Sequence, residues 1–181
     1  MFWRRHFLSF SRAILGLFAL IGFSGCVHLP RPATADQIKS LQTALVRLGP
    51  EVDERDAATV AALAYDYPRE LARNYRLVRP PLWHNLLINF GLKRRGLCYQ
   101  WAEDLGGKLK SVEPTSLEFH WGVSRPGSFW EHNTVVVTAR RQSFNEGLVL
   151  DPWRRSGVLV WTAVTNDSYV WHEGSWTLPS E

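Results

Sequence analysis

Cysteine is scarce in this chain: Cys26 and Cys98 are the only two among 181 residues. Two cysteines can form at most one disulfide, so the sequence excludes a small fold held together by a framework of disulfide bridges. The fold must instead rest on a hydrophobic core. About 147 residues follow position 34, enough for one domain with such a core, and no internal repeat or low-complexity segment divides them.

Long hydrophobic runs are equally scarce. The main one extends from Ala13 to Phe23 and is shorter than the roughly 20 apolar residues that a membrane-spanning helix requires. It follows Arg4, Arg5 and Arg12, and basic residues ahead of a short apolar run are typical of a secretory signal. We therefore predict that residues 1–25 are a signal peptide. An N-terminal membrane helix that stays attached is the alternative.

The segment Phe23-Ser24-Gly25-Cys26 resembles the lipobox of bacterial lipoproteins, in which the signal is cleaved before the cysteine and that cysteine is acylated. Phe23 stands where the motif usually has Leu. By resemblance to Gram-negative sorting rules, Val27 in place of Asp implies export to the outer membrane. The resemblance thus implies a lipid such as palmitate on Cys26, attachment to the outer membrane on its periplasmic side, and a tether over residues 26–34.

A large net charge of one sign is also missing from the exported part. The whole chain has 21 Lys and Arg against 17 Asp and Glu, and the predicted signal peptide removes three basic residues and no acidic ones. The remaining 18 basic and 17 acidic residues nearly balance, so charge gives no case for nucleic-acid binding. We interpret the one tight basic run, Lys93-Arg94-Arg95, as a solvated loop in preference to a substrate clamp.

Apolar residues recur at helical spacing through the first half of the predicted domain. The expected helices run from Asp36 to Leu48, from a cap at Asp53 or Asp56 through Ala64, from Pro68 through Tyr75, from Leu82 to Phe90, and from Cys98 to Leu109. Gly49-Pro50, Pro80-Pro81 and Gly91 supply stop signals between them.

After Pro114 the spacing of apolar residues changes from helical to alternating. The expected strands cover residues 117–124, 132–139, 148–150, 158–164 and 169–176, with the last at an edge and Asp151-Pro152 ending the third. Helices followed by a mainly antiparallel sheet are the α+β pattern. We therefore predict a single α+β domain over residues 35–181.

Cys98 lies where a short loop that contains Gly96 leads into the last predicted helix. A helix N-terminus carries about half a positive charge and unpaired N–H groups, which favour a thiolate and can hold a developing oxyanion. If Cys26 carries a lipid, Cys98 has no disulfide partner. Cys98 is therefore a candidate nucleophile, and a buried small hydrophobic residue is the alternative.

A nucleophilic cysteine needs a base beside it, and an imidazole base needs a third group that fixes its tautomer. His132 at the head of one predicted strand and Asp151 at the end of the next supply these groups in the order Cys, His, Asp. Each also has a simpler interpretation: His132 as a polar residue at a strand end, and Asp151 as the start of a turn.

Three segments together resemble the transglutaminase-like superfamily of papain-fold cysteine enzymes. They are Gly96-x-Cys98-x-x-x-Ala102, His132 followed by Val135-Val136-Val137, and Val149-Leu150-Asp151-Pro152-Trp153, which span residues 96–153. The resemblance implies a papain-like or transglutaminase-like core with the nucleophile at a helix N-terminus, and attack on an amide or other acyl carbonyl. Peptidase, amidase and acyltransferase activities all remain open.

The chain departs from that family at two places. Thr134 stands where the family often has an aromatic residue, and no Gln between Gln42 and Gln100 is available as an upstream oxyanion donor. We suggest the indole of Trp83, or less favourably the amide of Asn89, as the second donor beside the Cys98 N–H.

The geometry of the triad depends on how two strands are connected. If His132 and Asp151 lie directly opposite each other in an antiparallel pair, a connection of about eight residues separates their strands. Asn145 and Gly147 favour a tighter turn, which would put Asp151 opposite a residue near Arg140 instead. The triad therefore requires a wide loop.

Trp130 and Trp153 flank the proposed histidine and aspartate, where they could line a cleft and stack on a sugar or peptide, although core packing explains most tryptophans equally well. We expect no cofactor and no metal, because the other histidines of the predicted domain lack ligand-like spacing. The expected substrate is a peptide, protein or peptidoglycan. The alternatives are a non-catalytic lipoprotein that binds one of these or an envelope partner, and a structural component with Cys98 buried.

Overall fold

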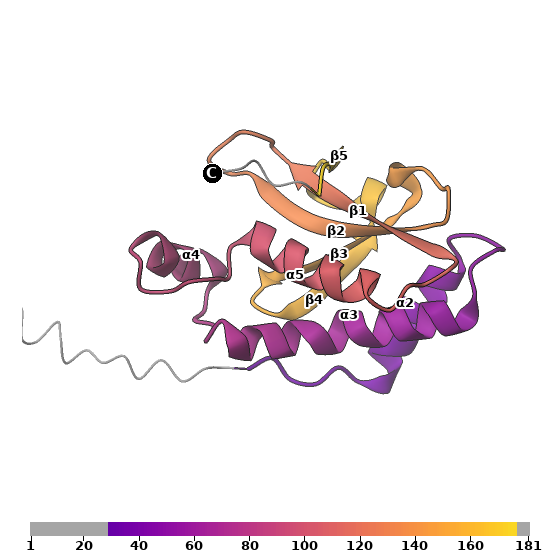
Figure 1. Cartoon of the computed structure of the whole chain (residues 1–181), viewed down its shortest axis with the longest axis horizontal. Helices are drawn as coiled ribbons and strands as arrows, with labels where there is room; N and C mark the ends of the chain where they lie inside the picture. Colours follow the sequence, from indigo (N-terminus) through magenta and orange to yellow (C-terminus); the bar gives the residue numbers. More distant parts are fainter. Residues whose placement is uncertain (1–28, 177–181) are drawn as a thin grey trace, which may run out of the picture.

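The computed structural model of the chain describes residues 29–176. Within that range four α-helices precede a five-stranded antiparallel sheet (Figure 1), which confirms the α+β class. The predicted signal peptide and the predicted lipid on Cys26 fall outside the described residues. The helices are α2 (Ala35–Val46), α3 (Glu54–Asn74), α4 (Pro81–Asn89) and α5 (Cys98–Lys110). The strands are β1 (Leu117–Ser124), β2 (His132–Ala139), β3 (Leu148–Arg155), β4 (Val158–Ala163) and β5 (His172–Gly174).

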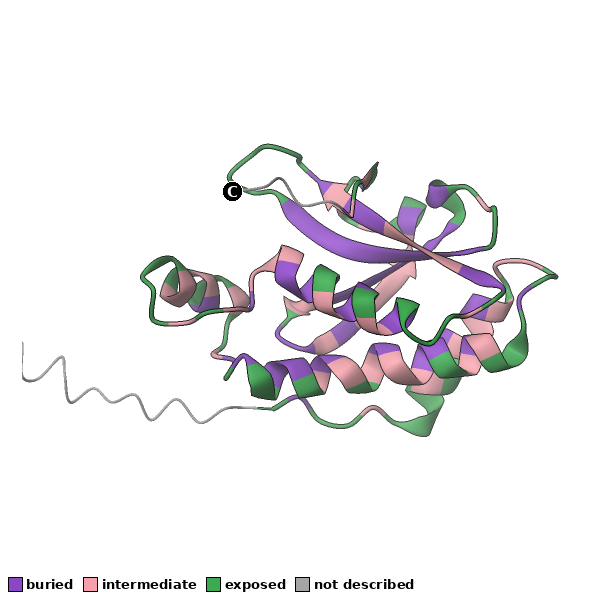
Figure 2. Cartoon of the chain, viewed as in Figure 1, coloured by how far each residue is buried: buried purple, intermediate pink, exposed green. Residues whose placement is uncertain are grey.

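The strand order is β4-β3-β2-β1-β5, so β2 lies at the centre of the sheet. Every residue of β2 is buried (Figure 2). On one face of the sheet α5 packs against β2 and β3, and α3 covers the other side of α5. The main core lies between these layers and consists mostly of Leu, Val and Ala side chains. A smaller cluster on Val136, Phe144, Val149, Val164 and Trp171 forms a second core.

The described chain begins against α3. Residues 29–34 form neither helix nor strand, yet Pro30 is buried and its carbonyl accepts a hydrogen bond from the Arg69 guanidinium at 3.1 Å. Thr34 then caps α2 by accepting a hydrogen bond from the Gln37 amide, a common start signal. No helix in residues 29–176 combines the length and the apolar character needed to cross a bilayer.

The prediction of separate helices on either side of Pro68 was wrong: α3 is continuous from Glu54 to Asn74, with Asp53 as its cap. Proline removes one intrahelical hydrogen bond and usually ends or kinks a helix. Here the buried residues recur every three or four positions across the proline. Burial of that continuous apolar stripe offsets the lost hydrogen bond.

Helix α4 forms close to the predicted range, but most of its apolar residues face outward. Its one buried residue is His84, whereas Leu82 is 58% exposed and Trp83 is 51% exposed. Phe90, just after the helix, is 70% exposed. Spacing alone does not say whether an apolar face is covered, and this one is not.

Strand β3 runs through Asp151-Pro152 to Arg155, although those two residues were predicted to end it. Pairing with β4 shifts between Asp151 and Arg155, and such a bulge accommodates a proline inside a strand. The last strand is shorter than predicted, since β5 covers only His172–Gly174 at the sheet edge.

The connection between β2 and β3 is the wide loop that the triad requires. It occupies residues 140–147 and contains a short 3₁₀ helix, Phe144–Glu146. Val135 pairs with Leu150 and Val137 with Leu148. This register is shifted by two residues from direct opposition of His132 and Asp151, so the two are diagonal neighbours on one face of the sheet.

Two adjacent glycines in α5 offer a matched test of this packing. A Cβ at Gly106 would lie 2.1 Å from the Trp176 ring, whereas a Cβ at Gly107 would meet nothing within 4 Å. We expect Gly107→Ala to raise the free energy of unfolding by about 0.5–1 kcal/mol through helix propensity. Gly106→Ala should lower it by about 1–3 kcal/mol through overpacking. Urea unfolding of both variants measures the difference, and equal effects would contradict the placement of Trp176.

Candidate active site

The loop before Cys98 is held by hydrogen bonds to α5. The Gln100 side-chain oxygen accepts from the Gly96 amide at 2.7 Å and from the Leu97 amide at 3.1 Å. The Trp101 indole donates to the Gly96 carbonyl at 3.0 Å. Gln three residues after a helix cap is a known start signature. These bonds fix Cys98 as the first residue of the helix.

Gly96 is also required by its contact with His84. Its φ is +131°, and a Cβ there would lie 2.4 Å from the imidazole. The buried His84 ring bridges two backbone segments: it accepts from the Val78 amide and reaches the Arg95 carbonyl at 2.9 Å. Burial lowers the pKa of His84, so the neutral ring acts as a brace between α4 and the nucleophile loop.

A charged network holds the same loop to α3 and α5. Arg95 donates to Glu103 and Asp104, each at 2.7 Å, and Tyr75 donates to Asp104. Of the basic run Lys93-Arg94-Arg95, interpreted above as a solvated loop, Arg95 is therefore engaged in ion pairs.

His132 and Asp151 form a buried hydrogen bond. The distance from His132 Nε2 to Asp151 Oδ2 is 2.6 Å, and the two residues are 2% and 0% exposed. Asp151 Oδ2 also accepts from Arg154 Nε at 3.0 Å, and Oδ1 accepts from the Arg154 amide. Because a buried carboxylate is costly unless it is paired, these contacts offset the cost of burying Asp151 inside the fold.

Arg154 is held in turn by Asp167. Two guanidinium nitrogens donate to the two carboxylate oxygens of Asp167 at 2.9 and 2.8 Å. The Trp171 indole and the Tyr169 amide also donate to Asp167. Although burial opposes it, hydrogen bonding by Arg154 lowers the pKa of Asp167 to about 2. Asp151, Arg154 and Asp167 thus form one hydrogen-bonded network next to His132.

The environment of His132 favours its protonated form. Burial lowers the pKa, but the hydrogen bond to Asp151 and the proximity of Cys98 outweigh it and raise the pKa to about 9. With Nε2 directed at the carboxylate, Nδ1 is the second nitrogen of the ring. It is buried and makes no hydrogen bond among the described residues.

Cys98 lies close to the start of β2 and to the His132 ring. Its thiol is free and partly exposed, and it contacts the carbonyl of Glu131, the residue before His132, at 3.8 Å. The same thiol is close enough to raise the pKa of His132. The structure thus brings Cys98, His132 and Asp151 to one place.

Aromatic rings enclose the imidazole of His132. The ring centroids of Trp153, Tyr169 and Trp171 lie 4.7, 5.0 and 5.4 Å from that of His132. The Trp153 indole donates to Asn85 on α4 at 3.3 Å. These contacts orient the ring and leave it only 2% exposed.

The other residues predicted for the site lie in exposed positions. Trp130 is 60% exposed and packs edge-on against Phe129, with centroids 5.2 Å apart. Trp83 and Asn89, suggested as oxyanion donors, are both exposed on α4. None of these three side chains touches the imidazole among the contacts described above.

Four residues that sequence patterns did not point to belong to the site: Asn85, Gln100, Arg154 and Asp167. Of these, only Gln100 could have been predicted from the sequence, because it lies three residues after the helix cap, where a Gln side chain often bonds to the residues before the helix. Arg154 and Asp167 meet through a bulged strand and a 3₁₀ turn, and nothing in residue spacing predicts that contact.

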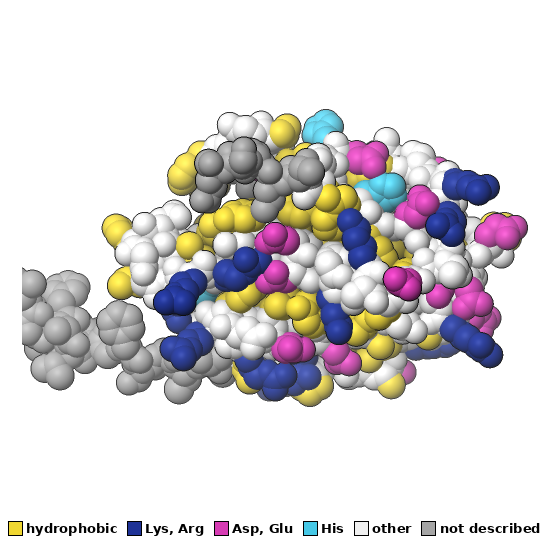
Figure 3. Space-filling view, in the orientation of Figure 1, with side chains coloured by type: hydrophobic (Ala, Val, Ile, Leu, Met, Phe, Trp, Pro, Cys, Tyr) yellow, Lys and Arg dark blue, Asp and Glu magenta, His cyan; other side chains and the backbone are white. Residues whose placement is uncertain are grey.

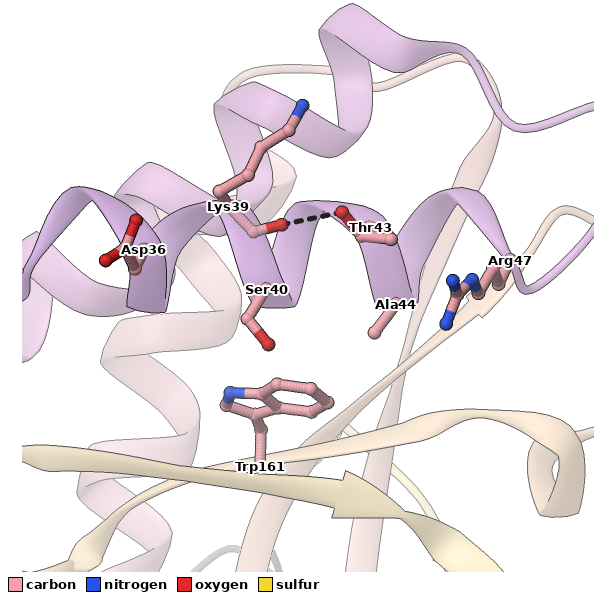
Figure 4. A pocket seen from close by; sticks show the side chains of 7 residues that line it. All are labelled: Asp36, Lys39, Ser40, Thr43, Ala44, Arg47 and Trp161. Carbon is pink, nitrogen blue, oxygen red and sulfur yellow. Dashed lines mark hydrogen bonds between the residues drawn. The ribbon is translucent and has the colours of Figure 1, made fainter.

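Two hollows in the described surface lie elsewhere. One is bounded by α2 and Trp161, whose ring faces Ser40 and Ala44 (Figure 4). The other is lined by residues of β1, the β2–β3 loop and β5, among them His120 and Glu173. Neither contains a member of the triad. Among residues 29–176 no group of three or more His, Cys, Asp and Glu side chains is arranged to hold a metal ion.

We expect NMR titration to give a pKa near 9 for His132, and Asp151→Asn to lower it, because burial would then act on an imidazolium without its carboxylate. The unfolded value is about 6.5. Protonation of His132 therefore contributes stability that is fully present below pH 6.5 and is lost as pH rises through about 9. His172→Gln, at an exposed position, is the control. A wild-type His132 pKa at or below 6.5 would contradict the ion pair.

Comparison of the chain with family models, with curated proteins and with solved structures finds no match. The likeness of residues 96–153 to the transglutaminase-like superfamily therefore stays a prediction. The α+β fold and the geometry around His132 stand on the structure itself.

Proposed function

We propose that this protein is a cysteine enzyme that acts on an amide or other acyl carbonyl through Cys98, His132 and Asp151. The observation that supports it most is the buried 2.6 Å hydrogen bond between His132 and Asp151, next to a free thiol at a helix N-terminus. A histidine that is charged at neutral pH beside a thiol is the arrangement that nucleophilic catalysis by cysteine requires. The helix α5 packed on an antiparallel sheet also suits a papain-like or transglutaminase-like core.

The proposed reaction has two steps. The Cys98 sulfur attacks the carbonyl carbon and forms a thioester, while the bond to the leaving amine or alcohol breaks and His132 Nδ1 gives that group a proton. His132 then takes a proton from water or from an acceptor amine, which attacks the thioester and releases Cys98. Asp151 keeps Nε2 as the donor nitrogen throughout.

The developing oxyanion would be held at the start of α5. The first backbone N–H groups of a helix have no intrahelical acceptor, and that of Cys98 lies beside the attacking sulfur. Trp83 on α4 is the proposed second donor, which would require its exposed indole to turn toward the site when substrate binds.

The location of the enzyme is part of the proposal. A lipid on Cys26 would attach the chain to the outer membrane, with residues 29–34 leading to the domain on the periplasmic side. Peptides, proteins and the peptide stems of peptidoglycan are then the available amide substrates.

The test uses p-nitrophenyl acetate, an activated ester that needs no specific substrate pocket. We expect release of p-nitrophenol together with an acetyl group on Cys98, which peptide mapping by mass spectrometry separates from Cys26. Cys98→Ala should abolish the adduct, and His132→Ala should slow its formation by about 10²–10⁴-fold. Addition of glycine ethyl ester shows whether the acyl group passes to water or to an amine.

Ser111→Ala, at an exposed position after α5, is the matched control and should leave the rate unchanged. Ester cleavage that is equal in the wild type and in Cys98→Ala would contradict the proposal. It would favour the alternative, a lipoprotein that binds peptidoglycan, a peptide or an envelope partner without turnover.

A further inference from the structure

The two segments that flank Cys98, the α4 region and the β1–β2 loop, carry exposed apolar side chains that together form an apolar rim. We define it by Leu82, Trp83, Leu86, Phe90 and Leu92 of the α4 region, together with Phe129 and Trp130 of the β1–β2 loop. Their exposed fractions range from 39% to 89%. Exposed apolar side chains that gather on one surface of a soluble domain usually mark an interaction site.

Both parts of the rim are tied to the candidate active site. On one side, Asn85 of α4 bonds to Trp153 against the His132 ring, and His84 packs on Gly96. On the other side, the Glu131 carbonyl that follows Trp130 contacts Cys98. The thiol therefore lies between the two apolar segments.

The charge around the rim is positive. Residues 76–95 include five Lys and Arg and not a single Asp or Glu. Arg95 is used in ion pairs, but Arg79 and Arg94 are exposed. Figure 3 shows basic and apolar side chains next to each other at the α4 end of the molecule. In the loop, the exposed Glu131 is the one acidic residue, and its carboxylate accepts hydrogen bonds from the Gly127 amide and the Asn133 side chain.

The start of the described chain lies near the same end. Pro30 is buried against the C-terminal half of α3, close to Gly157 and held by Arg69. Helix α3 leads within seven residues to α4. The 28 residues before Leu29 therefore join the domain on the side that carries the rim.

We propose that this rim docks on an anionic lipid surface, so that the Cys98 thiol opens at the interface between lipid and water. Tryptophan and phenylalanine beside arginine are the composition of interfacial membrane contacts. A protein or glycan partner would not require a flank of 20 residues without a carboxylate. The inference does not depend on catalysis by Cys98, and its test involves no substrate.

The experiment mixes the full chain, with Trp3 replaced by Phe in every variant, with vesicles of phosphatidylcholine and phosphatidylglycerol whose brominated acyl chains quench tryptophan only on contact. We expect quenching in the wild type and loss of most of it in Trp83→Phe/Trp130→Phe, because this variant keeps the rim apolar and removes its reporters. Trp161→Phe/Trp176→Phe, which changes tryptophans packed against helices, is the matched control and should keep the quenching.

Two further variants test the physical basis. Leu82→Ser/Phe90→Ser should reduce quenching while both rim tryptophans remain. Arg79→Gln/Arg94→Gln should reduce quenching in vesicles that contain phosphatidylglycerol and not in phosphatidylcholine alone. Lys39→Gln/Arg47→Gln, in α2 and directly after it, should have no effect in either vesicle type.

Quenching that is the same in the wild type and in Trp83→Phe/Trp130→Phe would overturn the proposal, even if the chain associates with vesicles through its N-terminal segment. Absence of quenching in the vesicles that contain phosphatidylglycerol would also overturn it and leave a protein or glycan as the occupant of the rim. Either result is independent of the p-nitrophenyl acetate assay.

Discussion

The buried hydrogen bond between His132 and Asp151 is the interaction on which the rest of the site depends. Neither residue is in contact with water, so each charge must be balanced by protein groups. One oxygen of Asp151, Oδ2, accepts hydrogen bonds from both His132 and Arg154. Both carboxylate oxygens of Asp167 accept hydrogen bonds from Arg154. Removal of any one member would leave a buried charge without its partner. The series is therefore rigid, and rigidity is what keeps an imidazole in one orientation beside a nucleophile.

The fold places this series by means of the central strand. Strand β2 is buried along its length and begins at His132, next to the start of α5. The wide β2–β3 loop sets a register in which Asp151 comes diagonally across from His132. The bulge after Asp151 then turns Arg154 back onto the same carboxylate. Two neighbouring strands and one helix thus supply the three groups, while α4 and the β1–β2 loop flank the thiol.

Much of this could be predicted from residue spacing, and the failures have physical reasons. The helix at Cys98 and the strand at His132 carry strong periodic patterns, so both were found within a residue or two. Pro68 was misjudged because a local rule about proline was outweighed by burial along the whole of α3. The exposure of the apolar residues of α4 could not be predicted, because periodicity does not reveal whether a neighbouring element covers a helix face. Arg154 and Asp167 meet only through tertiary structure, which no spacing encodes.

The central claim is that the sulfur of Cys98 lies beside a protonated imidazole. The most direct measurement compares the rates at which iodoacetate and iodoacetamide alkylate Cys98 in the folded chain as a function of pH. An imidazolium next to the sulfur attracts the anionic reagent, so iodoacetate should react faster at neutral pH, and this preference should disappear as pH rises through about 9 and in His132→Ala. A preference for iodoacetamide at every pH, unchanged by His132→Ala, would contradict the account.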